Sequence, residues 1–113
     1  MSARISSIDL PGVTGEYFTA ANAFDVDRTS ALFAENAEVM DEGKRLVGRE
    51  AIREWIERTM REFAATASPE HVDIRGASVV VIALVSGRFP GSPARLTFHF
   101  TVAGDQIAAL EIQ

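Results

Sequence analysis

The segment DVDRTSALFAENAEVMD, residues 25–41, decides the fold of this chain. The aspartates at its first and third positions are typical helix caps, and the apolar residues 31–34 predict a short helix behind them. Residues 35–36, Glu-Asn, predict a turn. Over residues 37–41 apolar and polar side chains alternate, which indicates a strand with one buried face. The segment therefore predicts a helix followed directly by a strand that ends on a carboxylate, Asp41.

A second helix is predicted before this segment. Asp9 and Pro11 combine an acidic cap with a proline in the first turn, and the polar residues 1–8 predict a disordered tail. Tyr17 lies in the middle of the apolar face, so we expect its ring to be buried and its hydroxyl to need a partner. The residues of that face recur at helical spacing: Val13, Tyr17, Ala20, Ala21 and Phe24.

The next segment predicts a hairpin and then a long helix. Residues 43–44, Gly-Lys, predict the hairpin turn, and residues 49–65 predict a helix with an apolar stripe from Ile52 to Phe63. Residues 68–69, Ser-Pro, are expected to break this helix. Two exposed ion pairs are expected on its outer face, Glu54 with Arg58 and Glu57 with Arg61.

The rest of the chain predicts strands. Residues 72–75 and 96–102 alternate between apolar and polar side chains, residues 78–85 (SVVVIALV) are apolar on both faces, and residues 107–112 form a last strand. Helices followed by a meander of strands indicate the α+β class, with three N-terminal helices packed on one face of a curved, mostly antiparallel sheet. We expect a single domain over residues 9–113.

The segment 78–85 also predicts an oligomer. A strand that is apolar on both faces is covered on both faces, and three helices can cover only one face of the sheet. A second copy of the chain is the simplest cover for the other face, so we expect a homodimer through the convex face of the sheet. The alternative is a monomer with an exposed apolar patch, which is uncommon at that size.

Composition excludes several classes of partner. The net charge is -5 and the chain has no basic run, which argues against nucleic acid or an anionic membrane. No apolar run approaches the ~20 residues of a membrane span, and the N-terminus lacks the apolar core of a secretory signal. The chain has no cysteine, which excludes disulfides and thiolate sites and fits a cytoplasmic protein.

No cofactor or metal is expected. His71 and His99 lie on different predicted strands, and two separated histidines make a metal site improbable. We expect His71 at the surface, and His99 at an interface or the surface. The glycines lack the context of a phosphate-binding loop, and no serine lies in a nucleophile-elbow sequence.

Tyr17 and Asp41 are the residues that could carry chemistry. A carboxylate in an apolar pocket is a stronger base, and a neutral phenol can donate a hydrogen bond to developing negative charge. The alternative is structural. Asp41 would then be an ordinary turn aspartate, and Tyr17 a core tyrosine bonded to a backbone carbonyl.

Four stretches of the chain resemble the nuclear-transport-factor-2-like superfamily, with the SnoaL-like polyketide cyclases and the ketosteroid isomerases as its nearest groups. They are Tyr17–Asp27 (Y-x-x-A-x-N-A-x-D-x-D), Ala31–Asp41 (ALFAENAEVMD), Gly48–Trp55 (GREAIREW) and Phe98–Ile112 (FHFTVAGDQIAALEI). The resemblance covers nearly the whole chain. It implies a cone of curved sheet closed by helices around a deep pocket, a cystatin-like fold that hosts many activities.

The isomerase pattern implies a role for two residues and lacks support at three others. Its catalytic tyrosine falls on Tyr17 and its general base on Asp41; in that family the base moves a proton next to a ketone while the tyrosine stabilises the enolate. The second oxyanion donor falls on Phe98, the supporting tyrosine on Ile56, and the proline after the base on Glu42. Losing one such donor typically costs ~10²–10³ in rate, so steroid isomerisation is not expected.

Three interpretations stay open. The first is an acid–base isomerase or cyclase acting on a small hydrophobic carbonyl compound in the cone, with Asp41 as base and Tyr17 as oxyanion donor. The second is a non-catalytic ligand-binding or dimeric scaffold module, and the third is a pocket filled by its own side chains. The apolar walls are expected to come from Trp55, Phe98, Phe100 and Phe33.

Overall fold

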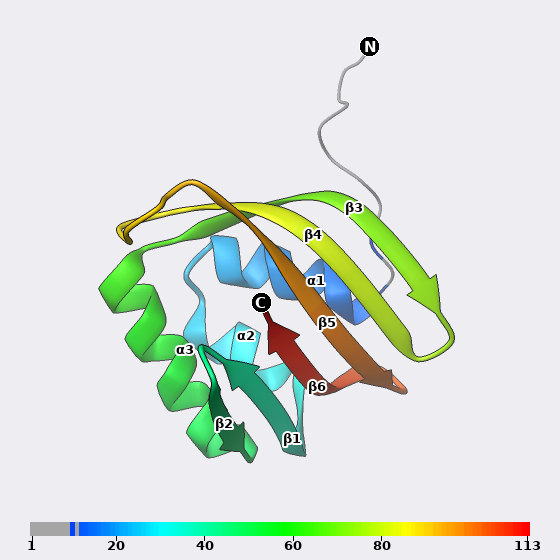
Figure 1. Ribbon diagram of the computed structural model, residues 1–113. Coiled ribbons are helices and arrows are strands. Elements are labelled where there is room, and N and C mark those ends of the chain that lie inside the picture. The colour runs from blue at the N-terminus through cyan, green and yellow to red at the C-terminus, as the bar shows by residue number, and fades with distance from the viewer. Residues whose placement is uncertain (1–9, 11) are drawn as a thin grey trace.

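The computed structural model describes residue 10 and residues 12–113, so the helix start at Asp9 and Pro11 and the predicted tail lie outside the described residues. Figure 1 shows the arrangement of the helices and strands. In chain order they are α1 (Gly12–Asn22), α2 (Val26–Ala31), β1 (Phe33–Asp41), β2 (Lys44–Val47), α3 (Arg49–Phe63), β3 (Thr66–Arg75), β4 (Ser78–Ser86), β5 (Ala94–Ala103) and β6 (Gln106–Ile112).

The described strands form one curved sheet in the order β2-β1-β6-β5-β4-β3. Neighbouring strands are antiparallel except β1 and β6, which pair in parallel. The three helices lie on the concave side of the sheet (Figure 1). The α+β class predicted from the sequence is therefore confirmed.

The prediction placed the junction between α2 and β1 too late. Asp25 caps α2 as expected, since its carboxylate accepts a hydrogen bond from the Arg28 backbone N–H at 3.0 Å. The helix nevertheless ends at Ala31, and the predicted turn at residues 35–36 is part of β1, where the register with β6 shifts. The reason is tertiary: Phe33 is fully buried, and its carbonyl accepts two hydrogen bonds from the Arg49 guanidinium, at 2.9 and 2.8 Å.

The end of α3 was also predicted wrongly. The helix ends at Phe63, because Ala64 adopts a left-handed conformation (φ 46°, ψ 44°) and its N–H bonds the Met60 carbonyl. Ser68 and Pro69 lie inside β3, not in a helix break. A proline is tolerated there because β3 is an edge strand with a register shift just after Pro69.

The turn between β1 and β2 fixes the position of Asp41. Glu42 and Gly43 both have positive φ, 53° and 76°, which is the pattern of a two-residue type I′ hairpin turn. The turn therefore lies one residue earlier than the predicted residues 43–44, and Lys44 belongs to β2. The tight turn pairs Asp41 with Lys44 across the hairpin. Ala37 and Val39, on the same face of β1 as Asp41, are fully buried, so the carboxylate lies on the concave face of the sheet.

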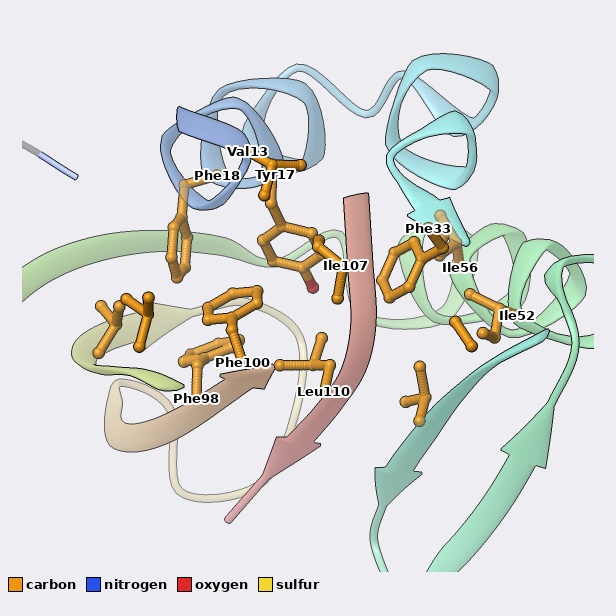
Figure 2. Close-up of a cluster of buried hydrophobic side chains, with 14 of the residues drawn as sticks. Val13, Tyr17, Phe18, Phe33, Ile52, Ile56, Phe98, Phe100, Ile107 and Leu110 are labelled. Carbon is orange, nitrogen blue, oxygen red and sulfur yellow. The ribbon is translucent and has the colours of Figure 1, made fainter. Parts of the chain in front are cut away.

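An aromatic cluster fills the space between α1 and the sheet (Figure 2). The ring of Tyr17 lies 5.3 Å from those of Phe18 and Phe100, 6.1 Å from Phe33 and 6.4 Å from Phe98, centroid to centroid. Most of these contacts are edge-on, the favourable geometry for aromatic pairs. The predicted inward face of β5 is confirmed by the burial of Phe98 and Phe100.

Two side-chain hydrogen bonds join the end of α1 to β3. The Asn22 amide nitrogen donates to the Ala67 carbonyl, and its oxygen accepts from the Ala67 N–H, both at 2.8 Å. The Asn22 amide therefore satisfies both backbone groups of Ala67, as a neighbouring strand would. This contact fixes the helix that carries Tyr17 against the edge of the sheet.

Gly87 packs closely against the backbone at the C-terminal end of α3. A Cβ added to Gly87 would lie 2.7 Å from the Phe63 carbonyl oxygen and 2.8 Å from the Ala65 Cα. Because the clash is with backbone, we expect Gly87→Ala to lower the free energy of unfolding by about 1 to 3 kcal/mol in urea titrations. The exposed neighbour provides the control: Ser86→Ala should stay within about 0.5 kcal/mol. Equal stability of the two variants would contradict this packing.

Candidate active site

The carboxylate of Asp41 is held by a tryptophan from the facing helix. The indole N–H of Trp55 in α3 donates to Asp41 Oδ2 at 3.0 Å. Trp55 is only 5% exposed, whereas Asp41 is half-buried. The second carboxylate oxygen, Oδ1, has no hydrogen-bond partner in the part of the chain that the structure describes. One oxygen thus orients the group, and the other is left free to accept a proton.

A cavity of about 250 Å³ opens beside this pair, between α3 and the β1–β2 hairpin. We call Trp55 and Asp41 the base of the cavity, because among the described residues Trp55 is its one buried lining residue and Asp41 is half-buried, whereas most of the others are exposed. Most of the lining is polar or charged. The lining residues are Asp41, Glu42, Lys44, Leu46, Trp55, Arg58, Thr59, Glu62 and Phe63.

Tyr17 lies deeper in the molecule and does not line this cavity. Its side chain is 7% exposed, and its hydroxyl points from α1 toward the sheet (Figure 2). Among the described residues no hydrogen-bond partner lies within reach of that hydroxyl. Burial raises the pKa of Tyr17 well above its usual range, and the negative charge of Asp41 raises it further. The phenol is therefore neutral, receives no hydrogen-bond partner from the described residues, and interacts electrostatically with Asp41.

The expected apolar walls divide into two groups. Trp55 lines the cavity, as predicted for a pocket wall. Phe33, Phe98 and Phe100 do not line it; they pack around the Tyr17 ring in the core. The structure thus brings Asp41 and Trp55 together at the cavity, and places Tyr17 with the three phenylalanines behind it.

Sequence reasoning missed most of the cavity lining. Arg58 was expected to pair with Glu54, but neither predicted ion pair of α3 is among those formed by the described residues. Such exposed pairs are worth only a few tenths of a kcal/mol, so they are easily lost. The helical spacing from Trp55 could have predicted these lining residues. Arg58, Thr59 and Glu62 follow Trp55 by three, four and seven residues and therefore lie on the same helix face.

Metal binding finds no support in the described residues, which include no group of three or more potential ligands. His71 is exposed on β3, as predicted, and His99 is half-buried on β5, on the face opposite Phe98 and Phe100. None of the described helices is long and apolar enough to cross a membrane.

Comparison with known proteins identifies relatives of this arrangement. The family model described as the SnoaL-like domain matches residues 15–110. A proposed polyketide cyclase from Sinorhizobium meliloti is 43% identical, with a TM-score of 0.90 over 93% of this chain and 96% of that chain. SalBIII, an epoxide hydrolase/cyclase-like enzyme of pyran ring formation in salinomycin, is 27% identical, with a TM-score of 0.73 over 88% of this chain and 85% of that chain.

A more distant structure shows the same fold. A protein from Catenulispora acidiphila with a ketosteroid isomerase-like fold, solved in complex with trimethylamine, is 20% identical, with a TM-score of 0.82 over 93% of this chain and 86% of that chain. No functionally curated protein matches the sequence significantly.

The burial of Tyr17 predicts an unusual titration. Tyr17 is the single tyrosine of the chain, so phenolate absorbance reports on it alone. In the folded protein it should stay neutral beyond pH 10, where the denatured chain ionises. Asp41→Asn should lower its pKa only partly, because burial is the larger cause. A folded-state titration that coincides with the denatured one would contradict the buried placement.

The same shift sets the pH dependence of stability. A folded-state pKa above the unfolded value means that the folded chain binds the proton more tightly. Its contribution is therefore fully present below about pH 10 and is lost as pH rises above that value. Tyr17→Phe should remove this alkaline loss, measured as the slope of the free energy of unfolding against pH.

Proposed function

The chain belongs to the SnoaL-like domain family, and we propose that it binds a small hydrophobic carbonyl compound and moves a proton next to the carbonyl group. A cyclisation or an isomerisation would follow from that step. Support for the class comes from the relatives named as a proposed polyketide cyclase and as an epoxide hydrolase/cyclase-like enzyme.

The observation that carries the proposal is the half-satisfied carboxylate of Asp41. The Trp55 N–H donates to Oδ2 at 3.0 Å, Oδ1 accepts no hydrogen bond from the described residues, and Asp41 lines the cavity. A general base needs a fixed orientation and an unoccupied lone pair within hydrogen-bond reach of the substrate proton. Asp41 Oδ1 takes the proton from the carbon next to the carbonyl, the C–H electron pair forms a C=C bond, and the π pair of the carbonyl moves onto its oxygen to give an enolate.

Tyr17 is proposed as the hydrogen-bond donor to that oxygen. Its raised pKa keeps the phenol protonated, and its hydroxyl has no partner among the described residues. A buried hydroxyl without a partner is costly, and a substrate oxygen would satisfy it. Because Tyr17 does not line the cavity, the substrate has to reach past the cavity base to touch it.

A non-catalytic binding module is the second candidate, and the packing around Tyr17 favours it. Phe33, Phe98 and Phe100 enclose the ring, so the donor and the base face different spaces in this structure. Phe98 also occupies the position at which the isomerase pattern has a second acid. A ligand confined to the outer cavity would meet Asp41 and Trp55 alone.

Deuterium exchange tests the proposed chemistry without knowledge of the natural substrate. Abstraction of a proton next to a ketone in D₂O replaces that hydrogen by deuterium, and NMR of β-tetralone measures the rate. We expect the protein to accelerate exchange and Asp41→Asn to slow it by about 10²–10⁴. Tyr17→Phe should slow it by a smaller factor, about 10², because water can take the place of the hydroxyl.

The matched control is Asp105→Asn, an exposed turn aspartate between β5 and β6. It should exchange the probe at the rate of the unmodified protein. If Asp41→Asn also keeps that rate, Asp41 is not the base and the binding-module candidate stands.

A homodimer through the convex face remains our proposal for the assembly. Val80, Ile82 and Leu84 on β4 are only half-buried within one chain, whereas Val79, Val81 and the other alternate residues of β4 are buried against the helices' side. The helices lie on the concave side (Figure 1), so a second chain is the proposed cover of this apolar row.

Sedimentation velocity tests the assembly. We expect a dimer at micromolar concentration, and a monomer for Ile82→Lys because a lysine would be buried in the interface. Glu57→Lys on the exposed face of α3, on the other side of the sheet, is the control and should leave the dimer intact. A monomer for the unmodified chain would overturn the proposal.

A further inference from the structure

We infer that the compound bound in the cavity carries a carboxylate, held at the cavity rim by Arg58 and Lys44. The inference rests on the proposed function and narrows it to keto acids. It begins from two cations that line the cavity and that make no ion pair or hydrogen bond with the described residues through their side chains.

The lack of partners distinguishes these cations from several other arginines. Arg45, Arg53, Arg75 and Arg95 each form an ion pair with a nearby carboxylate. Arg58 has its predicted partner Glu54 four residues away in the same helix, yet the pair does not form. Its guanidinium is therefore available at the cavity for a ligand oxygen.

The two cations approach the Asp41–Trp55 pair from opposite walls. Lys44 is the direct cross-strand partner of Asp41 in the β1–β2 hairpin. Arg58 follows Trp55 by three residues in α3, which places both on one helix face. An anion bound between them would lie close to the carbon that Asp41 deprotonates, without touching the Asp41 carboxylate.

The proposed role of Asp41 as a base disfavours a positively charged ligand. A cationic ligand would pair with Asp41 and weaken it as a base. An anionic group avoids Asp41 only if other groups hold it, and a planar guanidinium binds a carboxylate through two parallel hydrogen bonds. Glu42 and Glu62 also line the rim, so the ligand anion has to reach the cations between them.

The apolar part of the compound has a place beside the same groups. Trp55, Leu46 and Phe63 are the apolar side chains of the lining. They suit a small ring or chain attached to the ketone. The structure therefore points to a compact keto acid with an apolar substituent.

Two probes of one skeleton test the inference: β-benzoylpropionate, a keto acid, and its neutral methyl ester. Exchange next to the ketone is followed by NMR in D₂O. Binding is followed by the fluorescence of Trp55, which is the single tryptophan of the chain and lies in the cavity. We expect the acid to bind and exchange about ten- to a hundredfold better than the ester, as for a charge-assisted hydrogen bond.

Matched charge variants decide the sign of the ligand charge. Arg58→Gln and Lys44→Gln should weaken binding and exchange of the acid more than those of the ester, which brings the acid toward the level of the ester. Glu62→Gln removes a negative charge from the same rim and should strengthen binding of the acid. High salt should weaken the preference for the acid.

The outcomes separate this inference from the proposed function. Asp41-dependent exchange that is equal for acid and ester overturns the keto-acid inference and leaves the proposed function standing. If neither probe exchanges, the proposed base chemistry fails, and the keto-acid inference is then decided by the fluorescence titration. Equal affinities for the acid and the ester would overturn the inference. Weaker binding of the acid by Glu62→Gln would overturn it as well.

Discussion

The hydrogen bond between Trp55 and Asp41 is the contact on which the site depends. It joins the middle of α3 to the last residue of β1. Hydrogen bonds to a charged group are worth about 1.5 to 3 kcal/mol. One side of this contact is packed core, and the other side is the cavity. The same interaction therefore closes the fold and orients the proposed base.

Behind this contact, the aromatic core surrounds the side chain of Tyr17. The Tyr17 ring contacts four phenylalanines, so burial of its ring area favours folding, while its hydroxyl lacks a partner among the described residues. An aromatic residue without a hydroxyl would fit the same packing at lower cost. Packing alone does not explain why this position carries a hydroxyl, which also interacts electrostatically with the Asp41 charge.

The sequence predicted the features that depend on local pattern. The inward face of β5, the hairpin after Asp41 and the cap of α2 at Asp25 follow from alternation, turn chemistry and helix capping. Contacts between distant segments were missed. The early start of β1 depends on the Arg49 guanidinium, and the orientation of Asp41 on the Trp55 indole. Neither contact has a local signature in the sequence, because the two residues are 16 apart in one contact and 14 apart in the other and belong to different elements.

The position of Phe98 links the packing to the chemistry. The resemblance to isomerases places a second acid there, deep in the cone, and this chain has a phenylalanine that packs against Phe18 and Tyr17 instead. An apolar ring excludes the deep polar pocket and leaves the charged rim as the main source of polar recognition. In our proposal, polar recognition comes from the outer cavity, which Arg58 and Lys44 line together with the proposed base Asp41. A substrate recognised at its charged end and deprotonated a few atoms away is consistent with both the closed core and the open rim.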